Sequence, residues 1–529
     1  MIRKLRLLFL ILPCLLTAHT GGLMAAANPS DLETLVVQEG GRKKPFLVFA
    51  QESLRSISGR TSLILDGRKR DALEIMTAVW MDPDAGWEAK EMILVSNRPL
   101  RQKTGLDAGR KLFSPAELLS NAALTEEITK ASEMRRRDPK ARLGGLIKEA
   151  SDVGMRIGLL GALRQGTEYR IMPSDGNQWV APEAGSQDLG ALRAAWRAGD
   201  QAGFDTAVHK LQALQTSSVA MPSFWKIRLE VLYQKVHPFR WAWILYAAAG
   251  IVLLVLRGGK ARTGYRLAWV LAGGGFLLQA AGLASRVLIA GRPPVTNMYE
   301  SVIWVAFGTI LFALLFELRF RAATFLLGAI PVAVASLILA DSQPVILDTS
   351  IHPLTPVLRD NFWLTTHVLT ITLSYAAFAL ALGVAHVALV QVIRGGTPSG
   401  ELYGYLYKTL QVGVLLLAVG TILGGVWANY SWGRFWDWDP KETWALTALL
   451  GYLFLLHGRI SGMWGGFGLA IGSVLAFQSV LMAWYGVNFV LGAGLHSYGF
   501  GSGGFPLVAA FVACELLFTG AAFLAKRRS

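Results

Sequence analysis

The sequence predicts an all-α polytopic membrane protein of about nine transmembrane helices, preceded by a mixed α/β extracytoplasmic domain. The chain has 529 residues, of which 53% are hydrophobic and only 16% are charged. Residues 28–238 carry 30 Lys or Arg and 26 Asp or Glu, whereas residues 239–529 carry only 18 and 10. Long apolar runs recur in this second part, and each can cross a bilayer core of roughly 30 Å as a helix. Because lipid cannot satisfy backbone polar groups, we expect these runs to be helical.

The basic residues between these runs indicate how the chain is oriented. The predicted spans cover residues 239–256, 265–288, 298–317, 322–340, 364–393, 409–427, 443–459, 465–488 and 504–525. Lys and Arg dominate the loops that follow the odd-numbered spans and the C-terminal tail, whereas the other loops also contain Asp. The positive-inside rule therefore predicts a periplasmic N-terminal domain and a cytoplasmic C-terminus in a bacterial inner membrane.

The N-terminus has the pattern of an export signal. A positively charged start is followed by an apolar run over residues 7–16 and by small residues at 25–27. We predict that residues 1–27 are a signal peptide, with an uncleaved N-terminal anchor as the alternative. The chain then divides into an extracytoplasmic domain over 28–238 and a transmembrane domain over 239–529.

The charge and the cysteines exclude some classes of protein. The net charge of +15 divides into +3 in the leader, +4 in the soluble part and +8 in the membrane part. Because most of this excess flanks the spans, it does not indicate nucleic-acid binding. The chain has two cysteines, Cys14 and Cys514, and no Cys-x-x-Cys pair. A thiol-exchange role or a cysteine-based metal site is therefore not expected.

Short patterns predict strands and helices in the soluble part. Residues 61–65 and 92–95 are strand-like, and Asp66-Gly67 is a turn pattern. Ser114-Pro115 predicts the start of a helix, with Pro at its first position. Residues 189–215 are rich in Ala and Leu and are expected to be helical. Together these patterns predict the mixed α/β class.

The densest chemistry lies in residues 427–446, which read WANYSWGRFWDWDPKETWAL. Five tryptophans fall within 18 residues, interleaved with charged side chains: Trp427, Trp432, Trp436, Trp438, Trp444, Arg434, Asp437, Asp439 and Lys441. An interfacial belt that anchors helix ends is one interpretation. A plain anchor, however, needs neither this density nor acidic residues. A flat apolar ring with charged edges would use both, because indoles pack on its faces while Arg434 and Lys441 meet its carboxylates.

Residues 432–446 resemble the tryptophan-rich (WWD) signature of the haem-handling membrane proteins of cytochrome c maturation, and the match is best to the CcsA (ResC) type of system II. Three further stretches resemble segments of the same family. Residues 292–301 resemble its Pro-x-x-Asn-x-Tyr-Glu segment, and residues 361–368 and 494–499 resemble its two histidine-bearing segments. The resemblance covers roughly residues 265–525 and implies a polytopic helical fold that handles haem b.

Two histidines are expected on the same side of the membrane as the tryptophan-rich segment. His367 lies at the outer end of the fifth predicted span, and His496 lies in the outer loop after the eighth. A lone histidine at a helix end is more often structural. Two neutral imidazoles on opposite faces of a porphyrin, however, make a six-coordinate haem. We therefore predict that His367 and His496 are axial ligands of the haem iron, and the resemblance implies the same assignment.

A third histidine lies too deep to join that site. His457 is 13 residues past Trp444, so a helix places it roughly 20 Å deeper. The resemblance implies that His457 binds haem at an inner, intramembrane site. Its second ligand stays open between His386, His19 and a histidine of a separate CcsB-like subunit. The alternative for His386 is a hydrogen-bonded core histidine.

The resemblance implies a function in cytochrome c maturation. The protein would bind haem, move or present it to the outer face, and promote its thioether attachment to the Cys-x-x-Cys-His motif of apocytochrome c. This would make it a cytochrome c haem lyase (synthase), alone or with a partner. The alternatives are a haem exporter or chaperone without lyase activity, and a subunit that keeps haem for electron transfer.

The resemblance also implies partners. These are apocytochrome c, a CcsB (ResB)-like membrane subunit and the thiol-reducing proteins of the same pathway. Residues 38–45 resemble the Gln-x-Gly-Gly-Arg-x-x-Pro segment of fused CcsB–CcsA proteins. We therefore expect residues 28–238 to be part of a CcsB-like domain that positions the apocytochrome or contacts a partner. An unrelated extracytoplasmic domain is the alternative.

Overall fold

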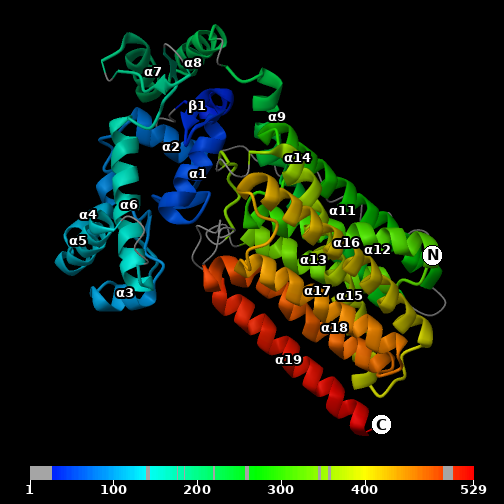
Figure 1. The fold of residues 1–529 in the computed structure, drawn as a ribbon. Helices are drawn as coiled ribbons and strands as arrows, with labels where there is room; N and C mark the ends of the chain where they lie inside the picture. The colour runs from blue at the N-terminus through cyan, green and yellow to red at the C-terminus, as the bar shows by residue number, and fades with distance from the viewer. Residues whose placement is uncertain are drawn as a thin grey trace. The chain divides into compact units, whose positions relative to one another are not determined.

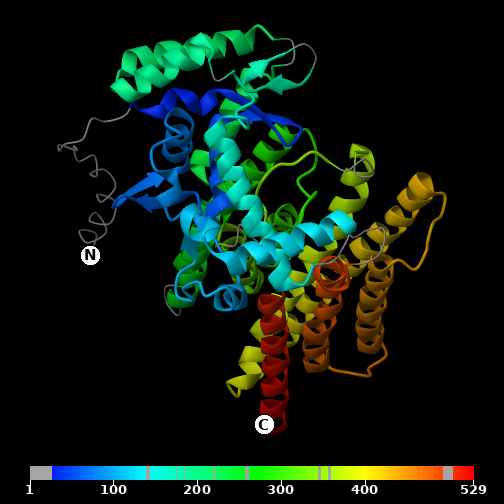
Figure 2. The same ribbon diagram turned by 90° about the vertical axis from the view of Figure 1, so that its left-hand side faces the viewer.

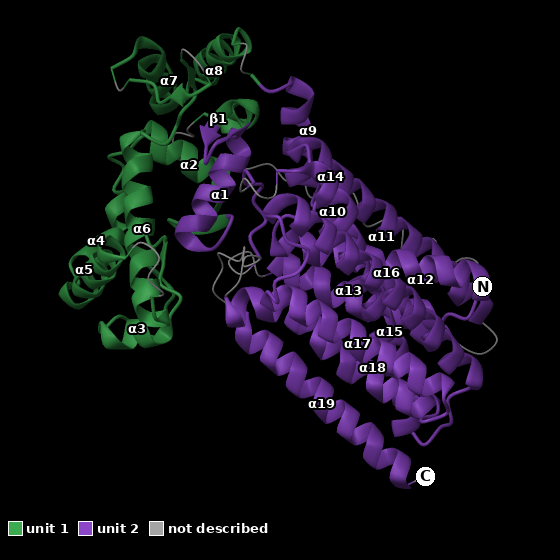
Figure 3. Cartoon of the chain, in the orientation of Figure 1, with its two compact units in different colours: residues 1–37, 62–221 green, residues 38–61, 222–529 purple. Residues whose placement is uncertain are grey.

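The structure is a computed structural model that describes residues 27–138, 143–174, 177–183, 185–218, 221–256, 261–342, 347–354, 359–492 and 504–528. The chain forms two compact units, residues 1–37 with 62–221 and residues 38–61 with 222–529 (Figure 3). A short N-terminal segment, residues 38–61, therefore belongs to the same unit as the membrane helices.

The first unit combines helices with short two-stranded sheets. Its helices are α2 (Ala72–Met81), α3 (Arg98–Lys103), α4 (Pro115–Leu119), α5 (Ala122–Arg137), α6 (Gly145–Gln165), α7 (Gln187–Ala198) and α8 (Gln201–Thr216), with 3-10 turns η1 (Pro29–Thr34) and η2 (Trp87–Ala89). Its antiparallel pairs are β3 (Ser62–Leu65) with β4 (Arg68–Asp71), β5 (Ile93–Leu94) with β6 (Leu112–Phe113), and β7 (Met172–Pro173) with β8 (Trp179–Val180). The predicted mixture of helices and strands is confirmed.

Local turn and capping chemistry explains these elements. Asp66 and Gly67 both have positive φ, 52° and 74°, as the tight turn between β3 and β4 requires. Ser114 accepts a hydrogen bond from the Glu117 amide at 3.2 Å and starts α4. The predicted helical run 189–215 is confirmed as two helices, because Gly199 ends α7 in the left-handed conformation at φ 67°.

The second unit is a bundle of long apolar helices (Figures 1 and 2). Within the described residues, nine helical stretches are long and apolar enough to cross a membrane, as predicted. They are Phe224–Val255 (α9, Phe224–Val236, and α10, Pro238–Val255), α11 (Ala261–Ala290), α12 (Met298–Phe320), α13 (Thr324–Ser342), Asn361–Ile393 (α14, Asn361–Trp363; η5, Leu364–Val368; α15, Leu369–Ile393), α16 (Gly400–Trp432), α17 (Pro440–Ile460), Gly466–Leu491 (α18, Gly466–Leu481, and η6, Met482–Leu491) and α19 (Phe505–Arg528).

A hairpin and one helix from the N-terminal region belong to this second unit. Strands β1 (Val36–Glu39) and β2 (Arg42–Pro45) are joined through Gly40 and Gly41, whose φ angles are 57° and 76°, and α1 (Phe46–Ser58) follows. Arg42 donates to both carboxylate oxygens of Glu230 on α9 at 2.9 Å. This ion pair, made through Nη1 alone, fixes the hairpin to the first membrane helix.

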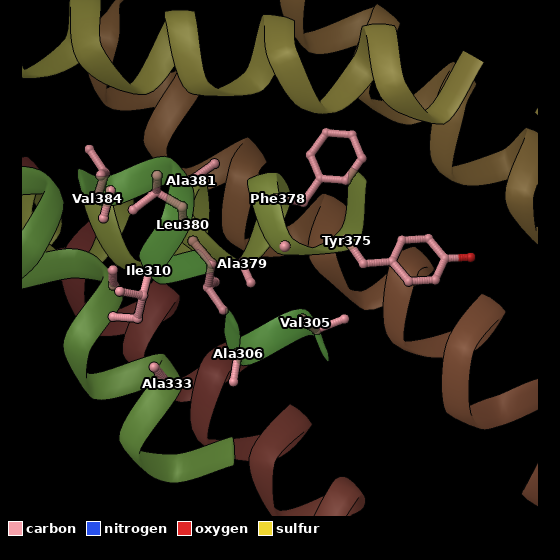
Figure 4. Close-up of a cluster of buried hydrophobic side chains, with 14 of the residues drawn as sticks. Val305, Ala306, Ile310, Ala333, Tyr375, Phe378, Ala379, Leu380, Ala381 and Val384 are labelled. Atoms are coloured by element: carbon pink, nitrogen blue, oxygen red, sulfur yellow. The ribbon is translucent and has the colours of Figure 1, made fainter. Parts of the chain in front are cut away.

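The core of the bundle lies between α12, α13 and α15, where small residues let the helices approach closely (Figure 4). A Cβ atom on Gly383 would lie 2.1 Å from the Gly328 carbonyl oxygen, so the backbones of α13 and α15 are in direct contact. Phe378 of α15 stacks on Tyr452 of α17 at 3.7 Å between ring centroids. Helix association in lipid depends on such close packing, because lipid tails are as apolar as the side chains.

Buried Glu317 holds the short connection between α12 and α13. Its carboxylate accepts from the amides of Ala323 and Phe325, both at 3.0 Å, and from the Tyr265 hydroxyl at 2.9 Å. These amides belong to the first turn of α13 and the residue before it, where backbone donors lack helical partners. Sequence reasoning did not single out Glu317, because nothing in its local pattern distinguishes it from a surface carboxylate.

Candidate functional site

The tryptophan-rich segment joins the end of α16 to the start of α17. Helix α16 ends at Trp432, and Gly433 follows in the left-handed conformation at φ 73°. Helix α17 begins at Pro440 with Asp439 as its cap. Helix α15 also begins at this end of the bundle, which we call the tryptophan end. The structure therefore brings the segment and His367 to the same end.

Between the two helices the chain folds back on α16. A Cβ atom on Gly425 would lie 2.5 Å from the Phe435 ring, so this ring packs directly on the α16 backbone. Trp436 and Trp438 lie edge to face, with 5.9 Å between ring centroids and an interplanar angle of 88°. Trp438 has a positive φ of 56° and is 69% exposed. A non-glycine residue in this conformation is uncommon, and here it turns a large apolar ring outward.

The charged residues of the segment bind one another and the start of α17. Arg434 forms an ion pair with Asp437. Asp439 accepts from the Lys441 amide at 2.9 Å, and Glu442 accepts from the amides of Asp437 and Asp439 at 2.9 and 3.3 Å. These contacts form a capping box that fixes the chain entering α17. In this structure Asp437 and Asp439 therefore shape the loop.

His367 faces α16 beside the first tryptophan of the segment. Its Nδ1 lies 2.8 Å from the Gly420 carbonyl oxygen. Since a carbonyl oxygen can only accept, Nδ1 carries a proton, so that in the neutral ring the lone pair is on Nε2. The imidazole centroid lies 5.7 Å from that of Trp427, at an interplanar angle of 59°. A partner on another helix thus sets both the tautomer and the orientation of the ring.

Glycines on α16 make room for this histidine. A Cβ atom on Gly424 would lie 2.6 Å from Cε1 of His367, and one on Gly420 would lie 2.9 Å from Cα of Ile371. His367 itself lies in a π-helical turn, η5. Such turns are rare and occur frequently at functional sites. The sequence placed His367 at a helix end but gave no sign of this turn.

The second predicted outer ligand, His496, lies outside the described residues. The last described residues before it form a π-helical turn, η6, which ends at Leu491 with Gly492 in the left-handed conformation. Trp484 within η6 donates from Nε1 to the Ser301 hydroxyl at 2.9 Å. The eighth span is thereby tied to α12 shortly before the chain reaches residue 493.

The two deeper histidines have different surroundings. His457 on α17 is exposed, and its Nδ1 lies 2.8 Å from the Leu453 carbonyl oxygen of its own helix. His386 on α15 bonds in the same way to Leu382, but its Nε2 lies 3.1 Å from Oε2 of Glu515 on α19. Its ring also stacks on Phe518 at 4.6 Å. Glu515, for which the sequence suggested no role, is thus the partner of His386.

The stretch 292–301 supplies the carboxylate of a buried ion pair at the tryptophan end. Arg286 and Glu300 are 1% and 2% exposed and lie 2.7 Å apart. Glu300 also accepts from the amide and hydroxyl of Thr296 at 2.8 and 2.6 Å, and its own amide donates to Asn297. Arg286 donates further to the Thr349 carbonyl at 3.0 Å. The Asn and Glu of this motif therefore hold the loop before α12 in place.

These residues fit a large, flat apolar ligand with a metal ion at its centre. An imidazole nitrogen is of the type that ligates metal ions, and the Nδ1 hydrogen bond to Gly420 orients the His367 ring as in most metal-ligating histidines. The indoles and Phe435 supply apolar surface beside it. The buried Nε1 of Trp436 has no hydrogen-bond partner among the described residues. A polar group on a ligand would satisfy this donor.

Comparison with known proteins gives consistent matches. A family model described as "Cytochrome C assembly protein" matches residues 295–496. "Protein NrfI" of Wolinella succinogenes is 29% identical over 504 residues, which cover 88% of this chain and 54% of NrfI. "Cytochrome c biogenesis protein CcsA" of Prochlorococcus marinus subsp. pastoris is 36% identical over 264 residues, 44% of this chain and 82% of that protein. The CcsA of Synechococcus sp. is 35% identical over 260 residues, with 42% and 83% covered.

These matches differ in extent. The chain spans about half the length of NrfI but most of the length of the CcsA proteins. The CcsA matches cover less than half of this chain, whereas the NrfI match covers 88% of it. The N-terminal extension therefore has its counterpart in NrfI.

Proposed function

Because the chain belongs to the CcsA family of cytochrome c biogenesis proteins, we propose that it binds haem b at the tryptophan end and presents it to apocytochrome c. One observation carries this proposal. His367 has Nδ1 bonded to the Gly420 carbonyl at 2.8 Å, and its ring lies beside Trp427. This arrangement supports His367 as an iron ligand through Nε2, with the tryptophan-rich segment as the surface for the porphyrin.

The residues of the chain bind and orient the substrate. The Nδ1 hydrogen bond to Gly420 orients the His367 ring and, in the neutral ring, selects the tautomer with the lone pair on Nε2, as iron ligation requires. Exposed Trp438 and Phe435 offer apolar surface, and Arg434 and Lys441 are cations for carboxylates at the edge of the ring. Arg434 would exchange Asp437 for such a carboxylate. We propose His496 as the second axial ligand, from the loop after η6.

Haem supplies two vinyl groups for thioether formation. Each cysteine thiol of a Cys-x-x-Cys-His motif adds across one vinyl group, so that a carbon–sulfur bond forms and the thiol proton goes to the other vinyl carbon. The protein contributes orientation, because two reacting groups held in place react as one molecule. On this proposal the enzyme is a haem lyase whose substrates are haem and apocytochrome c.

The inner histidine is proposed to bind haem before it reaches the tryptophan end. His457 is exposed on α17, as a ligand shared with another chain would be. His386 is engaged by Glu515 at 3.1 Å, which favours a second ligand from a separate CcsB-like subunit. Such a subunit and the thiol-reducing proteins of the pathway are the proposed partners. A bacterial inner membrane, with the tryptophan end and the N-terminal unit in the periplasm, is the proposed location.

The test is covalent haem attachment to a co-expressed apocytochrome with a Cys-x-x-Cys-His motif. The wild-type chain with its CcsB-like partner should produce holocytochrome and purify with a haem absorption band. His367→Ala and His496→Ala should lose both, whereas His457→Ala should lose the haem supply. Wild-type levels of holocytochrome from His367→Ala would contradict the proposal.

Haem content during turnover separates the related activities. A lyase loses its haem only when a covalent product forms. An exporter would release haem without attached product, and an electron-transfer subunit would keep its haem in the presence of apocytochrome. Following the haem absorption band and the covalent product together distinguishes the three.

A further inference from the structure

A groove lies on the side of the bundle, away from the place where His367 contacts α16. Its volume is about 840 Å³, and it is lined by α9, α11, the loop 291–294, α12 and the α14–α15 segment. Asn361, Thr365 and Leu369 line it and are spaced four residues apart, so they share one face of their helix. The proposed haem ligand lies on a different face of that helix.

The groove is apolar along its length and polar at one end. Leu283, Ala284 and Val287 of α11 line the apolar part. Lys226 at the start of α9 and Arg292 just after α11 lie where both helices meet the tryptophan end. An apolar body with an anionic head would match this division.

Two hydrogen-bond donors in the groove lack partners. Nε of Arg292 and Nε1 of Trp304 are buried and donate to no group in the described part of the chain, whereas Nη2 of Arg292 donates to the His352 carbonyl oxygen and the Thr296 hydroxyl. Burial lowers the pKa of Arg292, because the guanidinium has lost part of its hydration. An acceptor with negative charge would satisfy both donors and offset this cost.

The depth of the groove excludes some occupants. From Ala280 on α11 to Gly291 just after its end the lining spans 11 residues, or roughly 16 Å at 1.5 Å per residue. This is about half of a 30 Å hydrocarbon core, the depth of one leaflet. A partner's transmembrane helix would need the full thickness.

The residues that line the groove also exclude haem as its occupant. The described lining contains no His, Cys, Met or Tyr, so it offers haem iron no side-chain ligand of the usual kinds.

We propose that this groove binds an anionic phospholipid of the leaflet at the tryptophan end. The phosphate lies between Lys226 and Arg292, within reach of the Trp304 indole N–H. One acyl chain follows α11 along Leu283 and Val287 and contacts Phe307 and Leu369. The lipid fills the space between four membrane helices and supports the α14–α15 segment from the side opposite α16. This site is separate from haem binding and does not depend on it.

The experiment measures bound lipid on the full-length protein. The protein is reconstituted in nanodiscs with equal amounts of phosphatidylglycerol and phosphatidylcholine, extracted into mild detergent, and analysed by native mass spectrometry. Wild type should retain phosphatidylglycerol over phosphatidylcholine. Lys226→Ala and Arg292→Ala should each reduce this retention about five-fold, the change that corresponds to ~1 kcal/mol per cation.

A second variant tests the apolar part without changing charge. Ala284 is exposed in the groove, so Ala284→Trp should fill it and reduce retention of both lipids. Arg228→Ala, two residues from Lys226 but outside the groove lining, and Ala510→Trp on the exposed face of α19 are matched controls that should behave as wild type.

Three results would overturn the proposal. The first is wild-type lipid retention in the Lys226→Ala/Arg292→Ala double variant. The second is equal loss in the Arg228→Ala control. The third is that the groove variants lose a bound haem or a bound membrane protein, rather than lipid, relative to wild type. Because the readout is bound lipid, none of these results bears on haem attachment at the tryptophan end.

Discussion

Two histidines on one continuous helical stretch, His367 and His386, show how differently the bundle uses the same side chain. Both have Nδ1 2.8 Å from a carbonyl oxygen. The carbonyl partner of His386 is Leu382 on its own helix, whereas that of His367 is Gly420 on α16. His386 also meets the carboxylate of Glu515 at Nε2, while His367 lies against an indole.

The difference indicates which histidine holds the structure together and which is presented to a ligand. A carboxylate on Nε2 uses the atom that a metal would need. The hydrogen bond that Nδ1 of His367 donates to a carbonyl oxygen on another helix, by contrast, orients the ring in the way that is usual for metal-ligating histidines. Burial alone would not separate the two, because neither side chain is fully buried. The identity of the groups that each ring contacts is therefore the more informative observation.

The largest expected effect comes from replacing each of the two histidines in turn. His367→Ala should lower holocytochrome formation by at least roughly 10-fold, because even groups that only support a metal ligand are worth 10–100-fold. His386→Gln should keep most of the activity, because an amide can still donate to Glu515. The covalent haem product is measured in both variants. Equal loss in both would break the distinction and restore His386 as an inner haem ligand.

A smaller effect is expected from the glycine that His367 packs on. Gly424→Ala places a Cβ atom 2.6 Å from the imidazole, so the ring must move. We expect several-fold weaker haem retention, since overpacking typically costs about 1–3 kcal/mol. Gly451→Ala on α17 is the control, because nothing lies within 4 Å of its Cβ position. Haem absorbance and thermal unfolding are recorded together, and a loss of stability without loss of haem would contradict the assignment.

Removal of the carboxylate partner tests the structural side of the comparison. Glu515→Leu removes the carboxylate that lies 3.1 Å from Nε2 of His386 and should destabilise the packing of α19 on α15 by about 1–3 kcal/mol. Unfolding in detergent should therefore shift to lower temperature, while holocytochrome formation changes little. Glu515→Gln, which keeps a hydrogen-bonding group, should shift less. A selective loss of haem in Glu515→Leu would assign the pair to haem handling instead.

The smallest effect concerns His352, whose Nε2 also meets a carboxylate but outside the membrane helices. It lies 2.8 Å from Asp348, and the side chains are 60% and 52% exposed. The hydrogen bond with Asp348 raises the pKa of His352. Burial alone would raise the pKa of Asp348, but the hydrogen bonds that its carboxylate accepts lower that pKa below its ordinary value. At this exposure the pair should contribute less than ~1 kcal/mol.

The sign of each shift gives the pH window for this pair. The contribution of His352 is complete below its ordinary pKa of about 6.5 and is lost as pH rises through its raised value. That of Asp348 is complete above about 3.9 and is lost as pH falls through its lowered value. His352→Gln should therefore be less stable than wild type near pH 5 and equal to it at alkaline pH. Thermal unfolding at both pH values checks this, and a pH-independent difference would contradict it.

The helical spans could be predicted because their cause is local. An apolar run of sufficient length must form a helix in lipid, and all nine expected helices are present in the described residues. The first span begins earlier than expected, since α9 and α10 follow each other across His237, which has a φ of 49°. No apolar pattern marks α9, because it carries Lys226 and Arg228 among its hydrophobic residues.

Pairings across the bundle could not be predicted. Arg286 meets Glu300, and Glu515 meets His386 across 129 positions of sequence. Such charges are expensive in a membrane unless they are paired, but their spacing in the sequence does not identify the partners. The assignment of residues 38–61 to the membrane unit likewise depends on contacts such as that of Arg42 with Glu230.

By itself the sequence determined the membrane class, the number of helices, the family and the histidines and tryptophans that its motifs contain. Each follows from composition, run length or a motif that is continuous in the chain. Only the tertiary structure decided that His367 is oriented by Gly420 and packed on Gly424, whereas His386 is bound to Glu515. Helix rotation and approach fix these contacts, and in lipid they depend on packing between distant small residues, which no local pattern encodes.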